Sequence, residues 1–137
     1  MYLRGTQAEK NHIFTTAEKI CAAVQNIFRY EKCKIISVIL TSDDKEKIAI
    51  KIAENNSNEA KAFSDSQAAL IFGLMPFNEQ NQMFPTDFYC GIAAGAAVYI
   101  AYAQQLSATI SAAGSDAVLK AGLLPDEIKN ITVVCIG

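Results

Sequence analysis

The sequence lacks charge over a long stretch: no Asp, Glu, Lys or Arg occurs between Asp87 and Asp116. A helix that is apolar on every side does not lie on the surface of a soluble monomer, because none of its faces is suited to water. The stretch is therefore expected to be buried in a protein core, in a subunit interface or in a bilayer.

The composition of this stretch disfavours the bilayer. A membrane span needs roughly 20 mostly apolar residues, and the length alone would suffice. The residues are mainly Ala and Gly, however, and Gln104 and Gln105 would lie at or near the hydrocarbon. No cluster of Lys or Arg flanks the stretch to set an orientation. We therefore expect no membrane association and a helix buried by protein.

Two stripes at helical spacing predict how this helix packs. One stripe carries large side chains, and the other carries mostly small ones, which allow a second backbone to approach closely. Glycines inside a helix each cost roughly 1 kcal/mol relative to Ala, and close packing is the usual compensation. We expect a central helix packed on both faces, one of them against a second copy of the chain. The large residues are Phe88, Ile92, Tyr99, Tyr102 and Leu106, and the small ones are Gly91, Ala94, Val98 and Ala101.

Other absences exclude whole classes of function. The net charge is −2, so the chain lacks the basic surface that nucleic acids require. The only histidine is His12, and no spacing supports a nucleophile triad built on it. No glycine-rich phosphate loop follows a predicted strand, because Gly91 and Gly95 lie inside a helix. No side chain stands out as a catalytic acid or base.

The cysteines lack metal-like spacing. The four residues, Cys21, Cys33, Cys90 and Cys135, include no Cys-x-x-Cys pair, so we predict no metal site. Buried free thiols in a reducing compartment explain them best. Residues 1–12 contain no apolar run typical of a secretory signal, and we therefore expect a cytoplasmic protein.

The order of apolar segments predicts one layered domain of helices and a sheet. The chain has 137 residues, which suits a flexible N-terminal arm over residues 1–14 and a single domain over residues 15–137. Thr15 and Glu18 form a capping box that predicts the first helix start. Three apolar strands indicate a sheet covered on both faces, so the fold class is α/β or α+β. The strands are expected at 35–40, 68–74 and 131–136, with a short extended piece at 109–113, and further helices at 43–54, 86–106 and 115–120.

Two features are candidate ligand sites. Arg29, Lys32 and Lys34 precede the first strand, where they would contact a phosphate or else form a solvated connector. Small residues from Ser107 to Ser115 lead into a short helix. Backbone N–H groups at such a helix start would hold an anion or a planar ring, unless the segment is an ordinary tight linker.

The order of elements resembles the nitroreductase family of flavin enzymes. The resemblance rests on the long Ala-rich helix, the small-residue turn, the short helix before Leu124-Pro125 and the final strand that ends at Gly137. It implies an α+β, three-layer sandwich whose central sheet packs on a long buried helix at a homodimer interface. It also implies an oxidoreductase in which FMN passes hydride from NAD(P)H to a small organic substrate. The FMN-binding residues implied are Arg29, Lys32, Ser111, Ala112 and Gly114.

The chain also departs from that family. Closely spaced Arg and Ser residues are typical of the family N-terminus, and this chain has Arg4 and Thr6 there. The segment Ser64–Gly73 is similar to a related, ferredoxin-like group, but residues 75–85 contain no cysteine, so we predict no iron–sulfur cluster. The alternative prediction is a non-catalytic homodimer that keeps the scaffold, has lost flavin binding and binds another small molecule or a protein.

Overall fold

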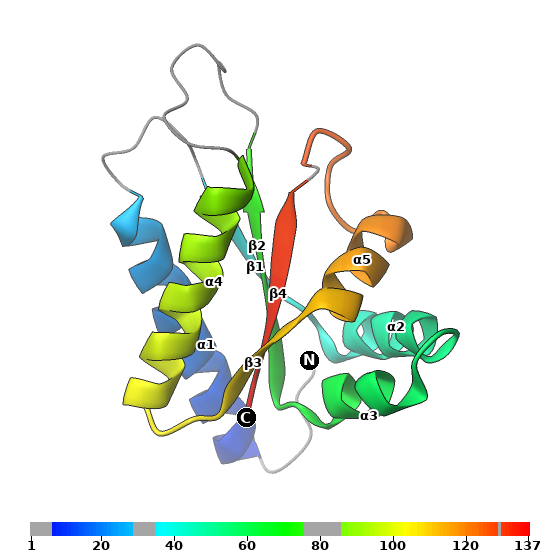
Figure 1. The fold of residues 1–137 in the computed structure, drawn as a ribbon. Coiled ribbons are helices and arrows are strands. Elements are labelled where there is room, and N and C mark those ends of the chain that lie inside the picture. The colour runs from blue at the N-terminus through cyan, green and yellow to red at the C-terminus, as the bar shows by residue number, and fades with distance from the viewer. Residues whose placement is uncertain (1–6, 29–34, 76–85, 129) are drawn as a thin grey trace.

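The computed structural model describes residues 7–28, 35–75, 86–128 and 130–137 of the chain. Helices and strands over these ranges form the α+β, three-layer arrangement that the sequence predicted (Figure 1). Arg29 and Lys32 lie outside the described residues. The helices are α1 (Gln7–Ile27), α2 (Ser42–Ala53), α3 (Ser57–Asp65), α4 (Thr86–Ala103) and α5 (Ala112–Ala121); the strands are β1 (Ile35–Ile39), β2 (Ala68–Leu74), β3 (Ala108–Ser111) and β4 (Ile131–Ile136).

The strands form one antiparallel sheet in the order β1-β2-β4-β3. Every residue of β2 is buried, which explains its unbroken apolar sequence. Ile39 lies opposite Leu70, Leu70 opposite Val134, and Val134 opposite Ile110. These residues therefore form one row across the sheet, and the row ends at β3, an edge strand of this sheet.

Helices cover both faces of the sheet, as predicted (Figure 1). Leu70 and Phe72 point to the face that α1 and α4 cover. Ala69 and Ile71 point to the opposite face, which α2, α3 and α5 cover. Because strand side chains alternate between faces, the apolar run of β2 supplies both cores at once.

Local capping sets the starts of the two helices that follow β1. The hydroxyl of Thr41 accepts a hydrogen bond from the backbone N–H of Asp44, so Thr41 caps α2. The side chain of Asn56 accepts from the N–H of Glu59 and donates back to its carboxylate, and this caps α3. The sequence left residues 59–66 unassigned, and the structure places most of α3 there.

Helix α1 begins at Gln7, and the predicted start at Thr15 is wrong. The apolar stripe of this helix already includes Ile13, which is buried together with Ala17 and Ile20. Packing of that stripe on the sheet therefore sets the helix, and the capping pattern at Thr15 and Glu18 lies within it. The residues predicted as an arm consequently overlap the start of α1.

Helix α4 is buried on one side only within this chain. Its small residues Ala93, Ala97 and Ala101 are fully buried against the sheet layer. On the other side Tyr99 is 76% exposed and Tyr102 is 59% exposed. The single chain therefore leaves one side of α4 exposed, although a helix without charge after Asp87 was expected to be buried on every side. Among the described helices, none combines the length and apolar composition needed to cross a bilayer.

Candidate functional site

The predicted site residues of the small-residue segment meet where β3 passes into α5. Ser111 is the last residue of β3 and the N-cap of α5, and Ala112 is the first residue of the helix. Gly114 lies in the first helical turn. The sequence placed the helix start at Ser115, so this junction comes earlier in the chain than predicted. Arg29 and Lys32, outside the described residues, are not placed relative to it.

The chain itself bonds two of the backbone N–H groups at the start of α5. The N–H of Gly114 donates to the hydroxyl of Ser111 over 2.9 Å. The N–H of Ala113 donates to the carboxylate of Glu59, on α3, over 3.3 Å. A helix N-terminus leaves its first N–H groups without helical partners, so it favours an anion. Glu59 is such an anion here, and the prediction that these groups bind a ligand has to compete with it.

Ser115 ties the start of α5 to the sheet. Its hydroxyl donates to the carbonyl of Ser111 over 2.9 Å and accepts from the N–H of Val133, on β4, over 3.0 Å. Ser111 also lies opposite Val133 in the sheet register. Ser115 therefore holds the last residue of β3, the first turn of α5 and the middle of β4 in one position.

Gly114 packs inward and does not face solvent. A Cβ atom at this position would lie 2.7 Å from the Ser111 hydroxyl oxygen and 3.0 Å from a ring carbon of Phe63. Both Ser111 and Gly114 are buried, whereas Ala112 is exposed. Of the three predicted residues at this junction, only Ala112 offers its side chain to a ligand.

Exposed apolar residues occur at and near the junction of β3 and α5. Ile110 belongs to the row of residues that faces α1 and α4, and it is 55% exposed. The hydroxyl of Tyr102, on α4, donates to the carbonyl of Ala108 over 3.2 Å and so links the helix to β3. Ile110, Tyr102 and Ala112 are exposed and mostly apolar, and these three residues are called the ledge. Sequence reasoning missed Ile110, because only the register shows which face of β3 it occupies.

The described cysteines are buried, and burial changes the pKa of two of them. Cys21, Cys90 and Cys135 are buried, as predicted. Burial raises the pKa of the Cys21 thiol to about 11 and also raises the pKa of Cys135. Cys135 borders a hollow of about 120 Å³ beside Ser66 and Thr109. Because the thiolate is the nucleophilic form, the raised pKa makes Cys21 and Cys135 poor nucleophiles near neutral pH.

Metal ligands do not gather within the part of the chain that the structure describes. In residues 7–28, 35–75, 86–128 and 130–137, no three His, Cys, Asp or Glu side chains come together as a metal site would require.

Comparisons with known proteins match this fold to solved structures. No protein-family model matches the chain, and no curated protein does. A nitroreductase family protein from Clostridium novyi NT is 16% identical, with a TM-score of 0.68 over 100% of this chain and 77% of that one. A protein from Bacteroides thetaiotaomicron VPI-5482, provisionally named NADH dehydrogenase/NAD(P)H nitroreductase, is 18% identical, with a TM-score of 0.62 over 100% and 77%. A Bacteroides fragilis NCTC 9343 nitroreductase with bound FMN is 12% identical, with a TM-score of 0.53 over 100% and 82%.

These matches show the fold. The chain has the nitroreductase fold, as its order of elements predicted. Because function depends on the residues of a site rather than on a fold, the cofactor and the reaction require separate arguments.

Proposed function

We propose that the chain forms a symmetric homodimer through the exposed side of α4. This side carries large apolar residues, including Phe88, Ile92 and Tyr99, which are 47%, 38% and 76% exposed. Gly91 and Gly95 lie on the exposed side too, and a Cβ atom at either glycine would meet nothing within 4 Å. Large residues and glycine gaps on one helix face are self-complementary under a two-fold axis, because each copy sets its rings over the glycines of the other.

The lack of charge on this face favours a second copy over an unrelated partner. Interfaces that must distinguish partners use charge complementarity, and no charge occurs between Asp87 and Asp116. Burying the face would also remove large apolar side chains from water, at roughly 25 cal/mol per Å².

Sedimentation equilibrium tests the homodimer. The wild-type chain is expected to sediment as a dimer, and Tyr99→Glu as a monomer, because the substitution buries two charges in the interface. Ile50→Glu is the matched control: Ile50 is 63% exposed on α2, in the opposite layer, and should leave the dimer intact. A monomeric wild type at high concentration would refute the proposal.

We further propose that the protein is an FMN-dependent oxidoreductase that uses NAD(P)H to reduce a small organic acceptor. The observation that carries the proposal is the apolar ledge at Ile110, Ala112 and Tyr102, beside the proposed dimer face, on a fold shared with an FMN-bound nitroreductase. Bound FMN would supply the hydride chemistry, and the protein would supply orientation.

The chain's own residues would hold the flavin in place. Ile110 and Ala112 would contact the ring, while Ser111 and Ser115 keep the strand–helix junction rigid through their hydrogen bonds. The first turn of α5 does not fit the phosphate, because Ser111 and Glu59 already accept from its N–H groups. The phosphate would then depend on cationic side chains, and Arg29 and Lys32 stay the predicted ones.

The same hydrogen bonds favour a second candidate function, a homodimer without flavin that binds another small molecule or a protein. A carboxylate and a hydroxyl of the chain take the place that an anionic ligand would occupy at α5. In that case the ledge would be part of a protein surface and would bind no flavin.

An FMN titration separates the two functions. The flavin enzyme should be stabilised by FMN, by roughly 2.7 kcal/mol at 100 times the dissociation constant. Ala112→Glu should abolish this stabilisation, because a larger, charged side chain would replace the apolar contact between Ala112 and the flavin ring. The variant should still fold, since an acidic residue at a helix start is favourable.

The control for the titration is Ser57→Glu, which adds the same charge at the first residue of α3. It should bind FMN as the wild type does. Absence of any FMN-dependent rise in the unfolding temperature of wild type would refute the flavin function and leave the second candidate.

A further inference from the structure

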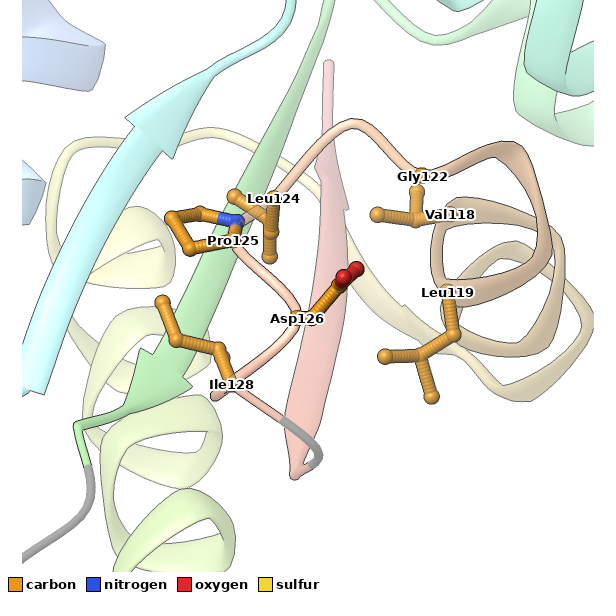
Figure 2. A pocket seen from close by; sticks show the side chains of 7 residues that line it. All are labelled: Val118, Leu119, Gly122, Leu124, Pro125, Asp126 and Ile128. Carbon is orange, nitrogen blue, oxygen red and sulfur yellow. The ribbon is translucent and has the colours of Figure 1, made fainter.

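A hollow of about 260 Å³ lies at the C-terminal end of α5, at the opposite end of that helix from the β3 junction. It is formed by the last turn of α5 and the segment that follows it toward β4 (Figure 2). Its volume is close to the lower end of the roughly 300–1,000 Å³ range of small-molecule sites. No role in the fold or in the proposed flavin function uses it.

The walls of this hollow are apolar. Val118 and Ile128 are buried and form part of its lining, at 0% and 3% exposure. Leu124 is half-buried and lines the hollow from the loop, and Leu119, 42% exposed, contributes on the helix side (Figure 2). Aliphatic side chains from the end of α5 and from the loop that follows it therefore line a space suited to a small apolar group.

The polar side of the hollow is negative. In Figure 2 the Asp126 carboxylate points from the loop toward the end of α5. The C-terminal end of a helix carries partial negative charge from its terminal carbonyl groups. The N–H of Gly122 bonds only one of them, that of Leu119. Lys120, the basic residue of this turn, pairs with Asp116 at 2.9 Å, one turn back along the helix.

We propose that this hollow binds a small organic ammonium ion, an amine carried on an apolar body of about the size of a phenyl ring. The ammonium group would pair with Asp126 and the α5 terminus, and the apolar body would contact Leu119, Leu124 and Ile128. Charge and shape act together here: an anion would be repelled, and a neutral molecule would gain only the apolar contact. The inference does not rest on flavin binding.

The test is a titration of the full-length protein, followed by two-dimensional amide NMR, with 2-phenylethylammonium chloride, 2-phenylethanol and phenylacetate. The ammonium ion should shift the amide signals of Val118, Leu119 and Ile128, and it should bind about tenfold more tightly than the alcohol. Phenylacetate should shift none of these signals. A tenfold difference corresponds to about 1.4 kcal/mol, within the range for a charge-assisted hydrogen bond.

Two substitutions make the assignment specific. Asp126→Asn should weaken binding of the ammonium ion about tenfold and leave binding of the alcohol unchanged. Glu127→Gln is the matched control, because Glu127 is an adjacent exposed acid outside the lining of the hollow, and it should change neither affinity. Equal affinities for the ammonium ion and the alcohol, or an Asp126→Asn variant that binds as the wild type does, would overturn the proposal. Both variants change exposed side chains, so an unchanged spectrum without ligand verifies their folding.

Discussion

Substitution of Gly114 by Ala tests how closely side chains pack around the start of α5. The new Cβ would lie 2.7 Å from the Ser111 hydroxyl oxygen and 3.0 Å from a ring carbon of Phe63. The hydroxyl accepts the hydrogen bond that caps the helix, and Phe63 is only 2% exposed in the second core. The added methyl group therefore has to displace the cap, the ring or both.

The expected loss of stability follows from these contacts. Losing an N-cap costs about 1 kcal/mol, and overpacking a core costs about 1–3 kcal/mol. Replacing Gly by Ala returns up to about 1 kcal/mol through helix propensity, and less in the first turn than in the interior. Gly114→Ala should therefore lower the free energy of unfolding by about 1–3 kcal/mol and the unfolding temperature by several degrees.

Urea unfolding followed by circular dichroism would measure this loss, in a cycle with Ser111→Ala. Removing the Ser111 hydroxyl also removes the nearest obstacle to the new Cβ. Gly114→Ala should thus cost at least about 0.5 kcal/mol less in the Ser111→Ala background than in the wild type. Gly95→Ala, measured in dilute solution, is the control, because open space surrounds that position and the change should stabilise α4. A stable Gly114→Ala variant, or purely additive losses, would contradict the described packing.

Three further predictions concern single side chains. Ser115→Ala should lower the free energy of unfolding in urea by about 1–3 kcal/mol, because the half-buried N–H of Val133 loses its acceptor. An unchanged urea midpoint would show that water replaces the hydroxyl as the acceptor. The raised pKa of Cys21 means that the folded state holds this proton more tightly than the unfolded state, so stability should fall as the pH rises from 9 toward 11. Replacing Cys21 with Ala should flatten that fall over the same pH range, and an identical pH profile in the variant would assign the loss to other groups. Lys120→Met should change the free energy of unfolding by no more than about 0.5 kcal/mol in thermal unfolding, because its ion pair with Asp116 is exposed. A larger loss would show that this pair stabilises the fold more than exposed ion pairs usually do.

Elements with a strong local pattern could be predicted from the sequence. The unbroken apolar run of β2 predicted a strand buried on both faces, and the structure confirms it. Glycine just past a helical run is a common end of a helix, and Gly122 ends α5 in the left-handed conformation, φ 68°, that favours glycine there. The nitroreductase-like order of elements was likewise readable, because it depends on the order of apolar segments rather than on individual contacts.

The start of α5 could not be predicted, because two serines compete for it. Ser111 and Ser115 both precede apolar helical residues, and either is a suitable N-cap by residue type. The competition is decided by β4: the Ser115 hydroxyl bonds the N–H of Val133, so Ser111 is left to cap the helix. The candidate site lies at this junction, where the N–H groups of Ala113 and Gly114 are bonded within the chain.

The sequence by itself determined that α4 carries no charge after Asp87 and two kinds of apolar side chain, because composition and helical spacing are local properties. Only the tertiary structure decided which of them faces inward. The alanines at 93, 97 and 101 turn to the sheet, because small side chains let the helix axis approach the strands, and Tyr99 and Tyr102 are left on the outer side. In the same way, Glu59 reaches the N–H of Ala113 across 54 positions of sequence, a contact set by the packing of α3 beside α5 that no local pattern records.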